Sequence, residues 1–151
     1  MTDLAVVEIN TETISIEFTA PGNNLDSDNK AAQYIFKYSS TAGNLTEDNF
    51  DQMQFNTVLL QSDLVESNLH PVVGGTVKQM KMKSSSLEKD RKYVLAMKAK
   101  DEAGNYSPVS NKAQIFISTT MSSSTSPALH HNNYPSFSFI CVIIFFKFVM
   151  Y

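Results

Sequence analysis

The stretch "RKYVLAMKAKDEAGNYSPVSN", residues Arg91–Asn111, decides the fold class of this chain. Apolar side chains take every second position over Tyr93–Ala99, and Lys98 and Lys100 fall on the opposite side. A period of two is typical of a β-strand with one face in a core. The turn formers in Gly104–Pro108 end such a strand. The stretch therefore predicts a core strand followed by a surface loop, and it contains no catalytic spacing.

A helix is the alternative for the same part of the chain. The segment "SLEKDRKYVLAMKAKDEAG", residues 86–104, is rich in the helix formers Leu, Glu, Lys, Ala and Met. The period of two over Tyr93–Ala99 and the aromatic residues upstream favour the strand. We therefore expect a strand here.

Short alternating runs separated by turn residues make up the rest of the first 120 residues. The run "TISIEFTA" alternates Ile14, Ile16 and Phe18 with polar residues, and "AQYIFKYSS" places Tyr34 and Phe36 on one face. Seven strands are expected, at residues 4–10, 13–20, 32–40, 53–60, 76–83, 93–100 and 112–118, with an irregular segment over 61–75. This pattern predicts an all-β sandwich. The side chains expected in its core are Phe18, Tyr34, Phe36, Leu87, Tyr93, Leu95 and Met97.

Composition divides the chain into three parts. Residues 1–120 hold the strands, and residues 121–136 form a linker rich in Ser, Pro and Asn, which cannot bury enough apolar area to order itself. Residues 137–151 form a hydrophobic tail. The only cysteine, Cys141, lies in that tail, so we expect no disulfide and no cysteine-based zinc site in the sandwich.

The tail "FSFICVIIFFKFVMY", Phe137–Tyr151, suggests membrane association. As a helix its 15 residues would span about 22 Å, less than the roughly 30 Å of a hydrocarbon core, and Lys147 interrupts it. Small residues over Ser122–Ser126, a polar spacer to Pro135 and then the apolar tail resemble a lipid-anchor signal. We expect an anchor signal or a short span, with an unusual chain end that has no membrane role as the alternative. The chain as given shows no signal peptide after Met1.

Charge limits the partners. The formal net charge is -3 and there is no basic block, which argues against a nucleic-acid partner. All acidic residues lie between Asp3 and Glu102, in segments expected to be polar loops or outward strand faces. Acid–base catalysis needs buried carboxylates with shifted pKa values, so we expect no enzyme, no cofactor and no small-molecule substrate.

Two groups of residues could suggest a metal site, and both are weak. His130 and His131 are neighbours in the linker and His70 precedes a proline, whereas a metal site needs three or four convergent ligands. Asp26 and Asp28 resemble part of a calcium loop, but the glycine and the distal glutamate of that loop are missing. Solvated loops are the favoured interpretation of both.

The acidic segment "TEDNFD" is also interpreted as a solvated turn. It contains Glu47, Asp48 and Asp51. If one helical turn follows Thr46, the first two carboxylates suit its N-terminus.

Two triplets fit the N-glycosylation pattern. They are Asn44-Leu45-Thr46 and Asn105-Tyr106-Ser107, and both fall in expected loops. Asn44 and Asn105 are therefore candidate glycan sites if the chain is secreted.

The segment around Tyr93 resembles a known turn. Leu87 precedes Tyr93 by six residues, as in the Leu-x-Pro-Gly-x-x-Tyr turn and tyrosine corner of fibronectin type III domains. The usual proline and glycine of that pattern are absent here: the three residues after Leu87 are Glu88, Lys89 and Asp90. In the family, the tyrosine hydroxyl bonds back to the chain and clamps the crossing between sheets.

Other segments resemble the same family. "EFTAP" resembles its second-strand Trp-x-x-Pro with Phe18 in the tryptophan place, "YIFKY" its third-strand Tyr-x-x-x-Tyr, and "AKDEAGNYSPVSN" the end of its sixth strand. The resemblance covers residues 3–119 and implies a seven-stranded fibronectin type III or immunoglobulin-like β-sandwich.

A narrower resemblance is to the carboxy-terminal module of calcium-activated chloride channel regulator proteins. It rests on "TAPG" followed by an acidic loop and "AAQYI", together with "LAMKAKDEAGNYSPVSNKAQIFI". Precursors of that family also have a metallohydrolase-like domain and a von Willebrand factor A domain, but this sequence has neither His-Glu-x-x-His nor Asp-x-Ser-x-Ser.

The resemblance implies a non-catalytic extracellular interaction or spacer module at the cell surface, held at a membrane through Phe137–Tyr151. It would modulate chloride conductance through a protein partner, such as a chloride channel. A fragment of an adhesion or receptor ectodomain is one alternative. A fragment of a self-cleaving metalloprotease precursor whose active site is absent here is another.

Overall fold

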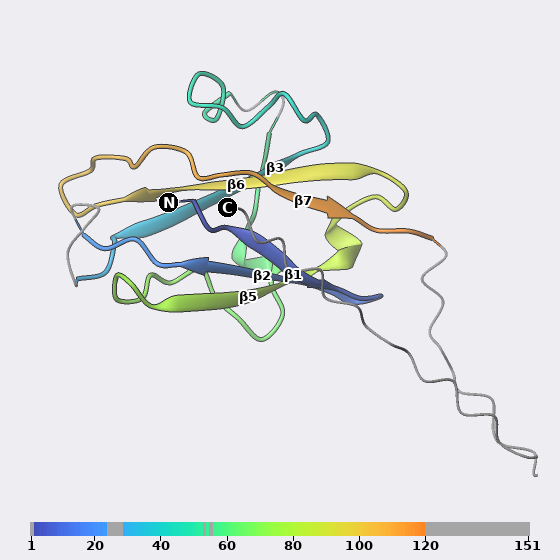
Figure 1. Cartoon of the computed structure of the whole chain (residues 1–151), viewed down its shortest axis with the longest axis horizontal. Helices are drawn as coiled ribbons and strands as arrows, with labels where there is room; N and C mark the ends of the chain where they lie inside the picture. The colour runs from blue at the N-terminus through green and yellow to red at the C-terminus, as the bar shows by residue number, and fades with distance from the viewer. Residues whose placement is uncertain (1, 24–28, 53, 55, 120–151) are drawn as a thin grey trace, which may run out of the picture.

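The computed structural model describes residues 2–23, 29–52, 54 and 56–119. These residues form two antiparallel sheets packed face to face, an all-β sandwich (Figure 1). The three-stranded sheet has the order β1-β2-β5 and the four-stranded sheet the order β4-β3-β6-β7. The strands are β1 (Ala5–Ile9), β2 (Thr13–Thr19), β3 (Gln33–Ser39), β4 (Thr57–Val58), β5 (Val77–Lys83), β6 (Lys92–Lys100) and β7 (Ala113–Phe116). The short 3-10 helices are η1 (Gln61–Asp63) and η2 (Ser84–Ser86).

The period of two in the sequence places the core between the sheets. Ile14, Ile16 and Phe18 of β2 are buried and face the alternate residues of β3 and β6. The Phe18 ring meets the rings of Tyr34 and Phe36 edge-on, with centroids 5.4 Å apart in both pairs. Edge-on packing directs the positive ring edge at a negative ring face, and each such pair adds about 1 kcal/mol to the burial itself. All seven side chains expected in the core belong to this one cluster.

Residues 92–100 form a strand and not the alternative helix. β6 pairs with β3 on one side and β7 on the other, and with nine residues it is the longest strand of its sheet. The helix propensity of its residues is overridden because a strand buries every second side chain against β2 and β5.

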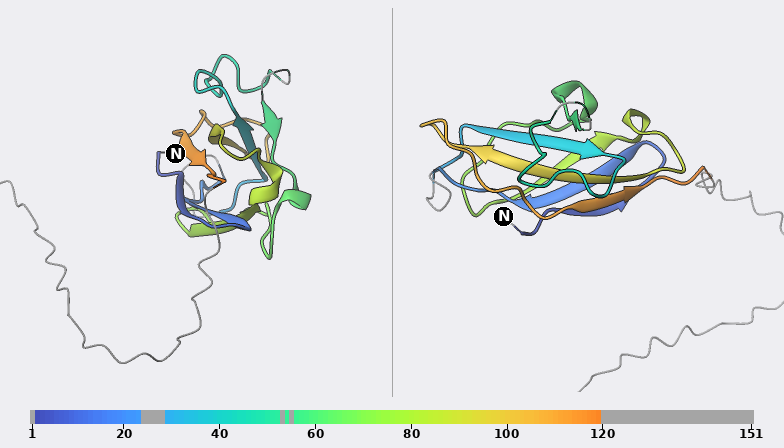
Figure 2. Two further views of the ribbon diagram at one scale, coloured as in Figure 1. Left: turned by 90° about the vertical axis from the view of Figure 1, so that its right-hand side faces the viewer. Right: turned by 90° about the horizontal axis from the view of Figure 1, so that it is seen from above.

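The sequence predicts one core face for β6, but its other face is buried as well. Every side chain over Tyr93–Ala99 is buried, including Val94, Ala96 and Lys98. The cause is the long connection between β3 and β4, which folds back over the outer side of the four-stranded sheet (Figure 2). The sandwich therefore carries a second, smaller apolar cluster outside its main core.

The corner before β6 has the tyrosine contact that the sequence suggests. The Tyr93 hydroxyl accepts a hydrogen bond from the Glu88 backbone N–H at 3.2 Å. Asp90 has a φ of 57°, in the left-handed region, and stands where the family pattern has glycine. Asp residues tolerate this conformation better than most, and the Asp90 carboxylate accepts the Thr119 N–H at 2.9 Å. That backbone hydrogen bond is the main cause that lowers the pKa of Asp90.

Several expected boundaries differ in detail. The fourth strand covers only Thr57–Val58, because it pairs with β3 over just two residues, and Phe55 lies outside the described residues. The irregular segment over 61–75 contains η1 and isolated bridges, such as Leu64 with Met82. The proposed linker (121–136) and hydrophobic tail (137–151) lie outside the described residues. In the ranges that the structure describes, no helix is long and apolar enough to cross a membrane.

Candidate functional site

The connection between β3 and β4 forms a structured cover over β3 and β6. We call residues 43–52 the cover loop. Its Leu45 and Phe50 are fully buried and pack on Val94 and Ala96 of β6. Leu45 has a φ of 59°, a conformation that costs a residue with a Cβ about 1–2 kcal/mol. Burying a leucine side chain contributes about 1.5–3 kcal/mol, so the apolar contact outweighs the strain.

The aromatic ring of the cover loop lies against two lysines. The Nζ atoms of Lys37 and Lys98 are 4.8 Å and 5.2 Å from the centroid of the Phe50 ring. Lys37 Nζ also donates a hydrogen bond of 2.7 Å to the Phe50 carbonyl oxygen. The two lysines come from β3 and β6, which are hydrogen-bonded neighbours, so their outward side chains meet under one loop. Cation–π contacts of this kind stabilise a partly desolvated ammonium group.

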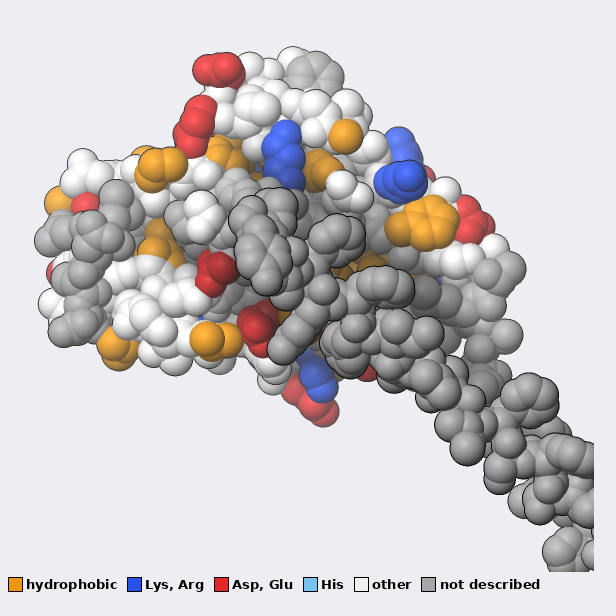
Figure 3. Space-filling model, viewed as in Figure 1, with side chains coloured by type: hydrophobic (Ala, Val, Ile, Leu, Met, Phe, Trp, Pro, Cys, Tyr) orange, Lys and Arg blue, Asp and Glu red, His pale blue; other side chains and the backbone are white. Residues whose placement is uncertain are grey.

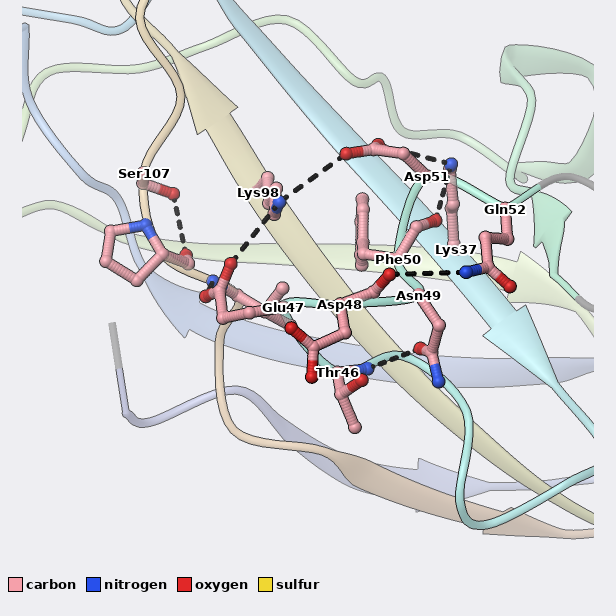
Figure 4. Close-up of polar contacts among 12 residues, drawn as sticks. Lys37, Thr46, Glu47, Asp48, Asn49, Phe50, Asp51, Gln52, Lys98 and Ser107 are labelled. Atoms are coloured by element: carbon pink, nitrogen blue, oxygen red, sulfur yellow. Dashed lines mark hydrogen bonds and ion pairs between the residues drawn. The ribbon is translucent and has the colours of Figure 1, made fainter.

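Two carboxylates of the cover loop neutralise these lysines (Figure 4). Asp51 lies 3.6 Å from both Lys37 Nζ and Lys98 Nζ, and Glu47 lies 3.4 Å from Lys98 Nζ. The lysine side chains are nearly buried, whereas the Asp51 and Glu47 side chains are 80% and 55% exposed. Exposed carboxylates are screened by water, so each pair contributes about 1 kcal/mol or less. Apolar burial, and not the ion pairs, therefore accounts for most of the attachment of the cover loop.

The solvated-turn interpretation of "TEDNFD" was incomplete. One helical turn does follow Thr46, whose carbonyl accepts the Phe50 N–H at 2.8 Å. Beyond that turn, however, Glu47 and Asp51 contact buried lysines, and Glu47 also accepts the Val109 N–H of the β6–β7 connection. These two carboxylates therefore face ammonium groups and, for Glu47, a backbone N–H of the neighbouring connection. Among the described residues, no three His, Cys, Asp or Glu side chains gather closely enough to hold a metal ion.

The sequence carries a signal for this cover that the period of two alone does not show. Leu45 and Phe50 are isolated large apolar residues in an otherwise polar segment, and Lys37 and Lys98 occupy outward positions of strands in the middle of the sheet. Apolar residues in a polar loop indicate a loop that packs on something. The register of β3 on β6, which brings the lysines together, cannot be obtained from either segment alone.

A groove lies where β6 begins and β7 ends. It has a volume of about 480 Å³ and is lined by Lys92–Val94, Gln114–Phe116, Ile9, Ser40 and Ala42. Most of its wall is apolar, and its size falls within the range of about 300–1,000 Å³ that is usual for ligand sites. No motif in the sequence indicates this groove, because its walls come from four separate segments of the chain.

Two side chains dominate the open rim of the groove. Phe116 of β7 is 45% exposed, and Lys92 of β6 is opposite it in the register of the two strands. Residues opposite each other on antiparallel strands have Cβ atoms about 5 Å apart on one face of the sheet. The groove is therefore lined by an aromatic and a lysine side chain that start from opposite positions of two paired strands.

Both candidate glycosylation sites lie in loops. The Asn44 amide nitrogen donates to Ser39 Oγ at 2.9 Å, at the start of the cover loop. The Asn105 amide nitrogen donates to Asp101 Oδ2 at 2.9 Å, and this hydrogen bond is the main cause that lowers the pKa of Asp101. The Ser107 hydroxyl accepts the Ala99 N–H at 2.9 Å. In the folded chain both asparagine amides therefore contribute to loop structure.

Of the remaining candidate residues, His70 is the one that lies in the described part of the chain. His70 is exposed in the segment before β5. Asp26, Asp28, His130 and His131 lie outside the described residues.

Neither a model of a known protein family nor a curated protein matches this chain.

Proposed function

We propose that this chain is a non-catalytic extracellular interaction module of the fibronectin type III kind, similar to the carboxy-terminal part of calcium-activated chloride channel regulators. The tyrosine corner supports the fold assignment, because the Tyr93 hydroxyl and left-handed Asp90 occur at the spacing of the family turn. Strand order supports it too. In immunoglobulin constant domains the fourth strand, D, belongs to the sheet ABED. The fourth strand here, β4, instead pairs with β3 in the sheet that corresponds to CFG.

The use of the ionisable side chains supports a non-catalytic role. The two buried lysines are engaged with Phe50, Asp51 and Glu47, which attach a loop to the sheet. Asp90 and Asp101 accept backbone N–H groups in turns. Each of these contacts stabilises a connection between strands, and the hollow at the end of β7 has mostly apolar walls.

The open groove beside an edge strand is the observation that carries the interaction role. In the part of the chain that the structure describes, β7 pairs with β6 on one side only, so its other edge has backbone groups free of strand pairing there. Edge strands with neighbouring apolar hollows bind extended segments of other proteins. In this proposal, any effect on chloride conductance passes through a partner protein that this surface contacts, and Phe137–Tyr151 holds the module at the membrane.

Surface expression together with current recording tests this proposal. The full chain is expressed behind a cleaved secretory signal in epithelial cells, and residues 121–151 behind the same signal are the control. We expect a surface protein that gives a larger chloride current than the control and is captured by cross-linking to a membrane protein. Asn44→Gln and Asn105→Gln should each remove a glycosidase-sensitive mass shift, and phospholipase treatment should separate a lipid anchor from a spanning tail.

A surface protein that leaves the current unchanged would overturn the chloride role. Capture of a cell-adhesion partner by such a protein would then favour the adhesion or receptor alternative. A chain that reaches the surface and captures no protein would overturn the interaction role itself.

A further inference from the structure

We propose that the groove at the end of β7 binds a short extended peptide segment of the partner, in which an apolar side chain alternates with carboxylates. This inference rests on the interaction role proposed above and names the surface and the chemistry of its partner. The partner would add a strand alongside β7, insert its apolar side chain into the groove and place a carboxylate at Lys92.

Apolar contact is the first component of this site. The Phe116 side chain is 45% exposed, whereas the side chains of Ala113 and Ile115 on the same strand are buried. Its ring flanks a hollow of about 480 Å³, which is larger than any one amino-acid side chain. A partner side chain seated there would remove from water a ring that the isolated module leaves partly hydrated.

Charge is the second component and selects the partner. Lys92 is exposed, and in the described part of the chain it makes no ion pair, unlike Arg91, which pairs with Glu88 at 2.7 Å. The Lys112 ammonium lies on the same rim, where it donates to the Ala42 carbonyl oxygen at 3.1 Å. On this face, Lys or Arg side chains lie on one side of an apolar side chain at the end of β7, and an Asp or Glu side chain lies on its other side (Figure 3). The two lysines at the groove, Lys92 and Lys112, favour a partner segment that carries carboxylates.

Length is the third component. β7 has four residues, which extend over about 13 Å. A partner segment of four to six residues would match it, with alternate side chains facing the groove.

Binding of two matched peptides tests this inference. The acidic probe is fluorescein-labelled Glu-Val-Glu-Phe-Glu-Val, and the basic probe has lysine in place of each glutamate. Fluorescence anisotropy of the full chain should give a dissociation constant at least tenfold lower for the acidic probe. Lys92→Gln should weaken the acidic probe threefold or more, and Phe116→Ser should weaken it about tenfold.

The control variants lie on the other sheet, and they remove one exposed lysine and one exposed apolar side chain. Lys81→Gln removes an exposed lysine of β5, and Val77→Ser removes a valine that is 60% exposed on that edge strand. Both should leave the affinity unchanged, and circular dichroism should show that all four variants keep the fold. Equal affinity for the two probes, or equal losses from the control variants, would overturn the proposed site.

Two further outcomes identify another occupant and also overturn the inference. If the acidic probe binds only after removal of residues 137–151, the tail of this chain fills the groove. If binding is lost as the chain dimerises, a second copy fills it. Failure here is distinguishable from failure of the proposed function, because cross-linking and chloride current of the Phe116→Ser variant would then equal those of the unchanged chain.

Discussion

The Tyr93 hydroxyl accepts the backbone N–H of Glu88 at 3.2 Å, and this hydrogen bond joins the turn before β6 to the first buried residue of the strand. Tyr93 is inside the main core and its ring meets the Tyr38 ring edge-on, with centroids 6.1 Å apart. The hydroxyl therefore sits at the end of a rigid side chain and fixes the path of a turn that contains a left-handed residue.

Replacing this tyrosine should destabilise the sandwich without changing its fold. Tyr93→Phe keeps the ring and leaves the part-buried Glu88 N–H without its partner, which costs about 1–2 kcal/mol. Urea unfolding measures the free energy of unfolding. Tyr106→Phe is the matched control, because that ring is 55% exposed, and its stability should be unchanged. Equal stability of the Tyr93→Phe variant and the unchanged chain would contradict a stabilising role for the corner.

The left-handed conformation of Asp90 makes a second prediction. Asp90→Val places a β-branched residue at a φ of 57° and removes the acceptor of the Thr119 N–H, so the variant should lose about 2 kcal/mol. Asp90→Asn keeps an acceptor oxygen and tolerates the conformation, so it should lose much less. Thermal unfolding of the two variants checks the difference, and similar midpoints would show that backbone strain at this turn is unimportant.

The cover loop should depend on its aromatic side chain more than on its charges. Phe50→Ala empties a fully buried position and should cost about 3 kcal/mol or more. Asp51→Asn removes a carboxylate that is 80% exposed and should cost about 1 kcal/mol or less. Denaturant unfolding gives both values. A larger loss from Asp51→Asn than from Phe50→Ala would mean that the ion pairs, and not apolar burial, hold the loop.

Stability should fall in acid because two carboxylates have lowered pKa values. Asn105 and Thr119 donate hydrogen bonds to the charged forms of Asp101 and Asp90 and lower their pKa values. A carboxylate whose pKa is lower in the folded chain contributes stability above the unfolded pKa of about 3.9, and this contribution disappears as the pH falls through the folded value. Urea midpoints between pH 6 and pH 2.5 measure the effect. Asp101→Asn should show a shallower decline, and an unchanged slope would contradict the assignment.

The strands and the corner follow from local sequence because their causes are local. The period of two in "TISIEFTA", "AQYIFKYSS" and "YVLAMKAK" selects which side chains face the core, whatever the rest of the chain does. The tyrosine corner joins residues only five apart, so its spacing is visible in the sequence.

The cover loop and the groove depend on tertiary structure because they join residues that are far apart in the chain. Glu47 reaches Lys98 only because the register of β3 on β6 places Lys37 and Lys98 under the same loop. Likewise, Phe116 and Lys92 share a rim only because β7 pairs with β6 in the register observed. The sequence by itself determined where the longer strands lie and which of their faces enter the main core. Strand register and the packing of the cover loop decided which outward side chains are covered and which remain exposed, because a shift of one residue would move every outward side chain to the other face.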